Sequence, residues 1–528
     1  MDGLPLLTLV FLTPIVLGVL LLLLPSEPIE VPRRTAFAFS LVPFAVSLMI
    51  LQAFDPALGT LQLTERVAWI PQLGAWYTLG VDGFSLWLIL LTTLLTPIVL
   101  LASWSDIQKR VKQFQAAMLI MEGLMIGALV ATDLLLFIVF WELMLLPMFL
   151  VIGVWGGPRR RYAALKFFLY TFVGSGLMLV AMIYLVLRHA GAGPLSFDIV
   201  GLYDNDLSMT EQLWLFSAFA FAFMIKVPMV PFHTWLPDAH TEAPTGGSVD
   251  LAGVLLKMGA YGFLRFALPI FPQAAELAFP IIITLAVIGI IYGAMVALPQ
   301  PDMKRLVAYS SVSHLGFIML GLYAWNITGM TGGVLQMVNH GLSTGALFIL
   351  VGYIYDRRHT REISEYGGLW GIVPIYSALL LVVVLSSIGL PGTNGFVGEF
   401  LILIGAFRAH PIAGAIATLG VVLGAVYLLT MYKNVIFGPV TKKVNETLQD
   451  LTPREIATVA PIILLIFWIG LYPKPFIERI EPTVKQLLAT LQDKGATHWM
   501  SEKDRHLLRE VAPHARPDPE LLSATGTQ

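Results

Sequence analysis

The stretch DLLLFIVFWELMLLPMFLVIG, residues 133–153, decides the fold class, because it is long enough to cross a bilayer and has one charged residue in its interior, Glu142. About 20 consecutive apolar residues span the hydrocarbon core of a membrane. Such runs recur along the chain, which has 528 residues, is 57% hydrophobic and only 12% charged, and has a mean hydropathy of +0.79. Soluble domains carry roughly twice that charged fraction. The sequence therefore predicts an all-α polytopic membrane protein.

Three more charged side chains lie within apolar runs. Lys226 is in WLFSAFAFAFMIKVPMVPF (214–232), Lys257 in LAGVLLKMGAYGFL (251–264) and Glu399 in NGFVGEFLILIGAF (394–407). A charge at the centre of a membrane helix costs about 2.5–3.5 kcal/mol on insertion scales, so such residues usually face a protein interior or a wet cavity. Together with Glu142 they suggest a relay for protons or ions.

The composition also limits the chemistry of this chain. It has no cysteine, which excludes disulfides, Cys-ligated iron–sulfur clusters and thiolate zinc sites. No Gly-rich phosphate loop stands between a strand and a helix. The net charge of -2 gives no indication of a nucleic-acid partner. Redox or ATP energy, if it drives the protein, must come from another chain.

Hydropathy, together with the polar and helix-breaking residues that separate the apolar runs, predicts about fourteen spans. They lie near 4–24, 35–54, 80–104, 114–131, 133–155, 164–188, 210–239, 246–270, 278–298, 305–324, 330–355, 371–409, 412–437 and 456–472. Residues 477–491 look amphipathic, and the polar remainder contains Pro513, Pro517 and Pro519. The first apolar run, 5–24, has almost no basic residues before it and no cleavage site after it, so we expect a retained span.

Basic residues separate the predicted loops into two classes. The odd-numbered loops carry Arg33, Arg34, Lys109, Arg110, Lys112, Arg159, Arg160, Arg161, Lys304, Arg305, Arg357, Arg358, Arg361, Lys442, Lys443 and Arg454, against Arg66, Arg188, Arg265 and Arg408 on the even side. The positive-inside rule places the odd loops in the cytoplasm and both termini outside. Because no transit peptide precedes the first span, we expect the inner membrane of a bacterium.

Two predicted spans are too long and too broken to be plain helices. Span 7 is interrupted in KVPMVPFHTWLP (226–237) and span 12 in SSIGLPGTNGF (386–396). Freed backbone at membrane depth is tolerated only inside protein or beside water. Each break is in the fourth member of a set of five spans, 4–8 and 9–13, which predicts two inverted five-helix repeats. The predicted units are then 1–113, 114–270, 278–437, 456–472 and 473–528.

The buried charges suggest roles. A nearby carboxylate favours the charged form of a lysine, so a Glu142–Lys226 pair that opens and closes would release and bind a proton; the alternative is a static buried ion pair. Lys257 has no acid within one turn, as suits a proton site. Asp250 lies about 10 Å earlier on the same helical face, either as a proton-inlet acid or as an acid that complements a helix N-terminus.

Other polar residues could extend the relay. Glu399 follows the break of span 12, where a terminal proton site would lie. His314 and His340 fall between Lys257 and Glu399, and the ordinary histidine pKa of about 6.5 suits a proton shuttle. His233, Asp238 and His240 in HTWLPDAH resemble metal ligands, but without an evident fourth ligand we favour a polar gate or loop anchor. Glu122 is a weaker relay candidate.

Long motifs then resemble one family, the M-type antiporter-like subunits of respiratory complex I (NADH:quinone oxidoreductase). The resemblance rests on FWELMLLPMFLVIGVWGG (140–157), residues 223–266, LVAYSSVSHLGFIMLG (306–321), MVNHGLSTGALFILVG (337–352) and GLPGTNGFVGEFLILIGAF (389–407). It implies a fourteen-helix fold with inverted repeats and a polar axis through the residues named above. Glu399 favours the M type, because sister subunits generally carry Lys there.

The resemblance implies a proton-translocating subunit that carries no cofactor itself. FMN, iron–sulfur clusters and quinone would belong to partner subunits, and the partners would include L-type and N-type antiporter-like subunits, small membrane subunits and membrane lipids. The alternatives are a subunit of an Mrp-type sodium/proton antiporter or of an ion-pumping hydrogenase, and a scaffold that moves no protons. Asp250 departs from the family, which usually has an apolar residue there, so the resemblance does not extend to the proton inlet.

Overall fold

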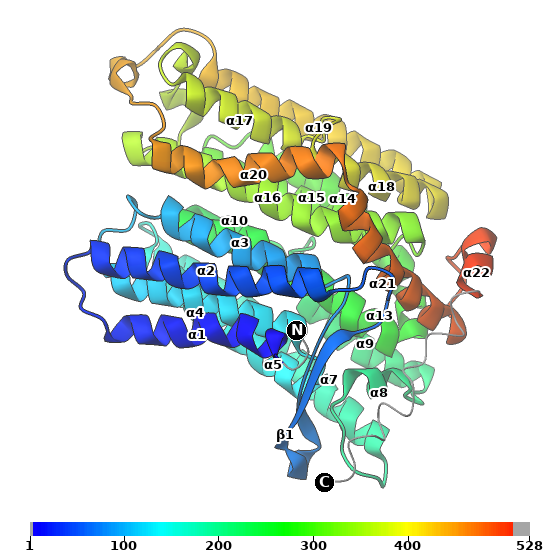
Figure 1. Cartoon of the computed structure of the whole chain (residues 1–528). Helices are drawn as coiled ribbons and strands as arrows, with labels where there is room; N and C mark the ends of the chain where they lie inside the picture. Colours follow the sequence, from blue (N-terminus) through cyan, green and yellow to red (C-terminus); the bar gives the residue numbers. More distant parts are fainter. Residues whose placement is uncertain (1–3, 510–528) are drawn as a thin grey trace.

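The computed structural model describes residues 4–509, which form a mostly helical bundle (Figure 1). The first half contains α1 (Leu6–Leu23), α2 (Glu30–Ala53), α3 (Leu86–Ala102), α4 (Val111–Val130), α5 (Leu134–Leu143), α6 (Leu145–Trp155), α7 (Arg160–Ala190), α8 (Ile199–Tyr203), α9 (Met209–Lys226), α10 (Trp235–Glu242), α11 (Thr245–Asp250), α12 (Lys257–Gly262) and α13 (Leu268–Ile270). The second half contains α14 (Pro272–Ala297), α15 (Met303–Leu322), α16 (Ile327–Arg358), α17 (Pro374–Ser387), α18 (Asn394–Ala409), α19 (Pro411–Ile436), α20 (Pro453–Leu471), α21 (Lys474–Asp493) and α22 (Glu502–Arg509).

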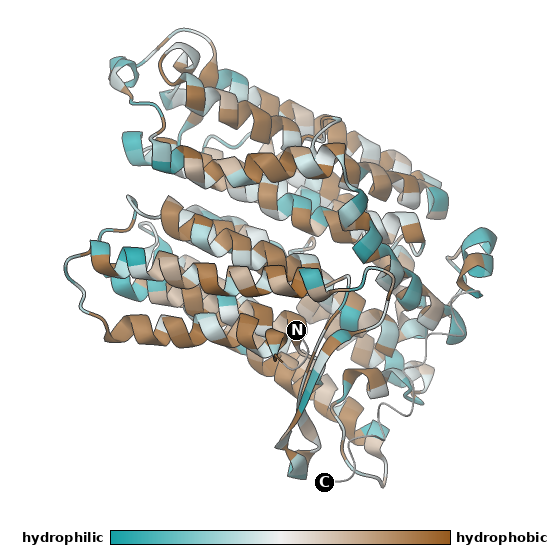
Figure 2. Cartoon of the chain, viewed as in Figure 1, coloured by the Kyte–Doolittle hydropathy of each residue, from teal (hydrophilic) through white to brown (hydrophobic). Residues whose placement is uncertain are grey.

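The long helices run side by side, with the first half of the chain in the lower part of Figure 1 and the second half in the upper part. Hydrophobic residues cover the bodies of these helices, whereas hydrophilic residues gather at their ends and on α21 and α22 (Figure 2). In the described part of the chain, eleven helices are long and apolar enough to cross a membrane. The protein is therefore a multi-pass membrane protein.

Every predicted span coincides with one or more helices, but the number that cross the membrane and the inverted repeat stay predictions. The prediction of a helical membrane protein is confirmed, and the structure adds one element that was not predicted. Between α2 and α3, the strands β1 (Gln62–Ile70) and β2 (Ala75–Val81) form an antiparallel hairpin. Both strands are rich in residues that favour strands, and Gly74 adopts a φ of +67° in the turn. The hairpin delays the start of α3 to Leu86.

The loops rich in lysine and arginine gather at one end of the bundle. Arg33 donates to the carbonyl of Ile107 at 2.9 Å, and Trp155 donates to the carbonyl of Lys109 at 2.8 Å. At the other end of the bundle, the start of α1 lies against β1. There the Leu7 N–H of α1 donates to the Glu65 carboxylate of β1 at 2.8 Å. The compartment that each end faces stays a prediction.

The segment 477–491, which was predicted to be amphipathic, lies within α21. This helix crosses the end of the bundle that holds the hairpin and buries Phe476, Ile480 and Val484. The Thr483 hydroxyl accepts from the Gly83 N–H at 3.0 Å, which ties α21 to the start of α3. The predicted polar tail with its prolines lies outside the described residues.

One residue assigned to a loop was misplaced. Arg265 lies in a π-helical turn, Phe263–Ala267, and is buried. Its guanidinium pairs with the Asp82 carboxylate at 2.6 Å and donates to the Tyr261 hydroxyl at 3.1 Å. A charge that seemed to belong to the membrane surface therefore joins α3 to the α12 region inside the bundle.

Candidate functional site

Two of the charged residues lie next to helix breaks, Lys226 at the end of α9 and Glu399 in α18 after the break that follows α17. α9 ends at Lys226, and a non-helical turn precedes α10. α17 ends at Ser387, and α18 begins at Asn394 after two glycines, Gly389 and Gly392, with φ of +75° and +93°. The breaks predicted within spans 7 and 12 are therefore present. Positive φ values favour glycine, which explains why this sequence can leave the helix there.

Two further irregularities were not predicted. The predicted span 5 divides at Met144 into α5 and α6, directly after the turn that carries Glu142. In addition, π-helical turns at Leu251–Leu255 and Phe263–Ala267 flank α12, which begins with Lys257. π turns are frequent at functional sites. No residue type marks π turns reliably, so they could not be predicted from the sequence.

Four of the candidate residues form a continuous row through the bundle. The Lys257 ammonium lies 2.7 Å from Nδ1 of His340 and also donates to the Ala252 carbonyl. The His340 and His314 rings have centroids 5.5 Å apart. Nδ1 of His314 lies 3.0 Å from Oε1 of Glu399. We call these four residues, Lys257, His340, His314 and Glu399, the Lys–His–His–Glu row; each is at most 7% exposed.

The end of the row at Glu399 is held by neighbours that sequence reasoning missed. Gln336 donates to the same Glu399 oxygen at 3.2 Å. The other oxygen, Oε2, faces the helix break, where a Cβ built on Gly389 would lie 3.0 Å from it. Asn339 donates to the Asn394 carbonyl at 2.8 Å and so joins α16 to the start of α18. The amides of LQMVNHG (335–341) within an apolar span are the signal that could have revealed these residues.

The Glu142–Lys226 pair has an open arrangement. Lys226 is 2% exposed, and its ammonium has no hydrogen-bond partner within the described chain. It lies 4.8 Å above the ring of Trp141, which donates to the Ser175 hydroxyl at 3.0 Å. Glu142 acts on Lys226 electrostatically, but the described residues show no ion pair between them. Trp141 therefore provides the direct contact of Lys226, a role that the sequence did not suggest.

The three polar residues of HTWLPDAH, His233, Asp238 and His240, each contact a different partner. Asp238 pairs with Lys166 at 2.7 Å. His233 packs edge-on against Tyr292 with ring centroids 5.0 Å apart, and the buried His240 stacks on Phe348 at 4.7 Å. Over residues 4–509, no group of three or more His, Asp or Glu side chains is arranged to hold a metal ion.

Glu122 and Asp250 are both buried, at 0% and 1% exposure. Asp250 is the last of the six residues of α11, so it lies beyond the first turn of that helix. The alternative in which Asp250 complements a helix N-terminus is therefore wrong. The two acids act on each other electrostatically, and neither forms an ion pair within the described residues.

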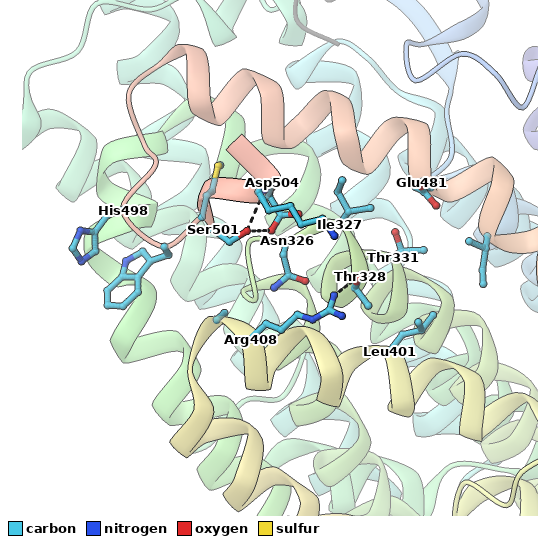
Figure 3. Close-up of a pocket in the computed structure, with 15 residues that line it drawn as sticks. Asn326, Ile327, Thr328, Thr331, Leu401, Arg408, Glu481, His498, Ser501 and Asp504 are labelled. Atoms are coloured by element: carbon cyan, nitrogen blue, oxygen red, sulfur yellow. Dashed lines mark hydrogen bonds between the residues drawn. The ribbon is translucent and has the colours of Figure 1, made fainter. Parts of the chain in front are cut away.

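A cavity of about 940 Å³ lies away from the buried charges, near the hairpin end of the bundle. Figure 3 shows it between α16, α18 and the segment that precedes α22, with Asn326, Arg408 and Ser501 around it. Arg408 donates to the Thr328 hydroxyl at 3.4 Å across its wall. None of the Lys–His–His–Glu row lines this cavity.

Comparison with known proteins identifies the family. Residues 131–424 match the family described as NADH:quinone oxidoreductase/Mrp antiporter, and residues 9–132 match the amino terminus of NADH-ubiquinone oxidoreductase chain 4. The NADH-quinone oxidoreductase subunit M of Rhodobacter capsulatus is 47% identical over 469 residues, which cover 86% of this chain and 90% of that protein. The chain belongs to the subunit M (chain 4) family of NADH:quinone oxidoreductases.

Similar proteins include a plant relative and chains of solved complexes. The NADH-ubiquinone oxidoreductase chain 4 of Arabidopsis thaliana is 42% identical, with 90% of this chain and 96% of that protein covered. A chain of respiratory complex I from Thermus thermophilus superposes with a TM-score of 0.84 at 33% identity over 92% of this chain and 99% of its own length. A chain of the Mrp complex from Dietzia sp. has a TM-score of 0.82 at 20% identity over 94% and 100%, which shows a shared fold.

Proposed function

We propose that this protein is a proton-translocating membrane subunit of an NADH:quinone oxidoreductase, and that protons pass along the Lys–His–His–Glu row. The observation that carries the proposal is the series of contacts from Lys257 to Glu399, with hydrogen-bond distances at its two ends and a contact between the two imidazole rings in its middle. Lysine, histidine and glutamate can each gain and lose a proton, and intramembrane ionisable residues commonly form proton relays. A purely structural role would not require four such groups as neighbours in space.

Each step moves one proton from one side chain of the row to the next. The Lys257 ammonium gives a proton to Nδ1 of His340 and becomes a neutral amine. The imidazolium of His340 then loses the proton of its other nitrogen, Nε2, toward His314, and His314 passes a proton from Nδ1 to Oε1 of Glu399, 3.0 Å away. Glu399 releases it at the α17–α18 break toward the outside.

Glu142 and Lys226 would couple this transfer to quinone chemistry in partner subunits. A carboxylate that approaches Lys226 stabilises its proton, and a carboxylate that withdraws releases it. Lys226 lies over Trp141 and has no hydrogen-bond partner among the described residues, which supports a pair that can change its separation. A change of charge at Lys226 would alter the proton affinity of Lys257.

The remaining proposals concern the orientation of the protein in the membrane, a polar gate and the partner subunits. The Lys- and Arg-rich end would face the cytoplasm of a bacterium, with both termini outside the inner membrane. His233, Asp238 and His240 would form a polar gate at that end, where His240 lies within electrostatic range of Lys304 and Lys257. L-type, N-type and small membrane subunits would be the partners, and FMN, iron–sulfur clusters and quinone would reside in partner subunits.

Proton pumping per electron in the assembled complex, reconstituted in vesicles, tests the proposal. We expect Lys226→Ala and Glu142→Ala to lower this ratio, whereas Lys474→Ala, whose side chain is 65% exposed, is the matched control and should not change it. An unchanged ratio in both Lys226→Ala and Glu142→Ala would leave only the scaffold alternative. Co-purification with small Mrp subunits, in place of NADH-binding and iron–sulfur subunits, would favour the antiporter alternative.

A further inference from the structure

Buried polar groups without protein partners are concentrated between α3, α4 and α11. Glu122 on α4 has neither oxygen hydrogen-bonded, and Oδ2 of Asp250 on α11 has no partner within the described chain. The Thr96 hydroxyl lies close to Glu122, and it donates to the Thr92 carbonyl at 3.1 Å. Buried polar groups are nearly always paired, so such a concentration indicates a functional site.

The two acids cannot both be ionised at low cost. An unpaired carboxylate in an apolar interior carries a large desolvation penalty, and two carboxylates that act on each other add repulsion. No lysine, arginine or histidine forms an ion pair with Glu122 or Asp250 in the described structure. The pair therefore holds at least one proton.

More unpartnered polar atoms lead from this pair toward the Lys- and Arg-rich end. Within residues 4–509, both amide atoms of Gln115, two helical turns before Glu122 on α4, lack partners, and so does the Ser103 hydroxyl at the end of α3. That hydroxyl lies 2.5 Å from the position of a Cβ on Gly246, one turn before Asp250. Asp106, three residues after Ser103, accepts from the Thr245 N–H at 3.4 Å.

In the other direction, Asp250 adjoins the π-helical turn that leads to Lys257. The turn Leu251–Leu255 follows Asp250 directly, and the Lys257 ammonium donates back to the carbonyl of Ala252 within it. The rise from Asp250 to Lys257 is about 10 Å. The acid pair thus lies between the Lys- and Arg-rich end and the first member of the Lys–His–His–Glu row.

We propose that Glu122 and Asp250 form a proton-binding site that fills from the Lys- and Arg-rich end, past Ser103 and Gln115, and supplies Lys257. In each transfer one proton leaves the carboxyl pair and turns the Lys257 amine into an ammonium. The next proton, taken from solvent at that end, restores the pair. The supply step rests on the proposed function, whereas the binding of a proton by the pair does not.

Infrared spectroscopy of the assembled complex tests proton binding directly. A protonated carboxyl gives a carbonyl stretch that shifts in D₂O. We expect the wild type to show such an absorption, the double variant Glu122→Gln/Asp250→Asn to lose that component, and the control Glu30→Gln, at a surface acid paired with Arg33, to keep it. A double variant with the wild-type spectrum would overturn the proposal.

Pumping measurements test the supply step. We expect Asp250→Asn and Glu122→Gln each to slow pumping roughly tenfold or more, the double variant to be no slower than the worse single variant, and Asp250→Ile to be worse than Asp250→Asn. Pumping at the wild-type rate in both single variants overturns the supply step, even if the infrared component is lost. If Lys257→Ala also pumps normally while that component is present, the proposed function fails but the proton site stands.

Discussion

Removal of His340 should interrupt the row at its centre. The Lys257 ammonium lies 2.7 Å from its Nδ1, and the His314 ring lies 5.5 Å beyond, centroid to centroid. Without the imidazole, Lys257 and His314 are separated by about three hydrogen-bond lengths, which is too far for direct proton transfer. A positioned proton-transfer group contributes typically about 10²–10⁴-fold to a rate. We therefore expect His340→Ala to slow transfer between Lys257 and Glu399 by that factor.

Two variants separate proton transfer from packing at this position. His340→Gln can still hydrogen-bond to Lys257 but cannot carry a proton at the pH of the cell, whereas His340→Ala also leaves a cavity. Both should lower the number of protons pumped per NADH oxidised in vesicles that contain the assembled complex, and both should leave the amount of assembled complex near that of the wild type. A His340→Gln complex with the wild-type ratio would refute the row as the path.

Two further predictions concern stability. Because the Asp82–Arg265 pair is buried, Asp82→Asn should destabilise the protein by about 3–5 kcal/mol, seen as a lower midpoint of thermal unfolding, and Asp82→Leu combined with Arg265→Met should recover most of the loss. Gly395→Ala places a Cβ 2.0 Å from the Ser386 carbonyl and should destabilise the α17–α18 break by about 1–3 kcal/mol; the control Gly176→Ala, which meets nothing within 4 Å, should be neutral or slightly stabilising. A Gly395→Ala midpoint equal to that of Gly176→Ala would contradict the proposed packing.

Much of the site could be predicted from the sequence because the bilayer makes charge rare. A lone lysine or glutamate in an apolar run, such as Lys257 or Glu399, is costly and therefore informative. The proline and glycine clusters likewise predicted where α9 and α17 end. The hairpin of β1 and β2 was missed because a hydropathy scan looks for apolar runs of about 20 residues, and the shorter strands of mixed polarity lie in the loop between the second and third predicted spans.

The pairing of residues could not be predicted. Sequence reasoning offered Glu142 as the partner of Lys226, but the structure places the ammonium against Trp141. It also placed Arg265 in a loop, where no partner was expected, although Asp82 lies 2.6 Å from it in the fold. Contacts between distant segments depend on how helices pack and on the π turns that rotate side chains. Neither is encoded in a local pattern.

The sequence by itself determined that this protein is a multi-pass helical membrane protein of the subunit M family and which buried charges it carries, because hydropathy and charge are properties of single residues in a known solvent. The tertiary structure alone decided that His340 and His314 join Lys257 to Glu399 as neighbours. It also decided that Glu122 and Asp250 act on each other electrostatically and that neither forms an ion pair within residues 4–509. The physical reason is that a proton moves over a few ångströms, and only the packing of α12, α15, α16 and α18 brings groups from four helices within that distance.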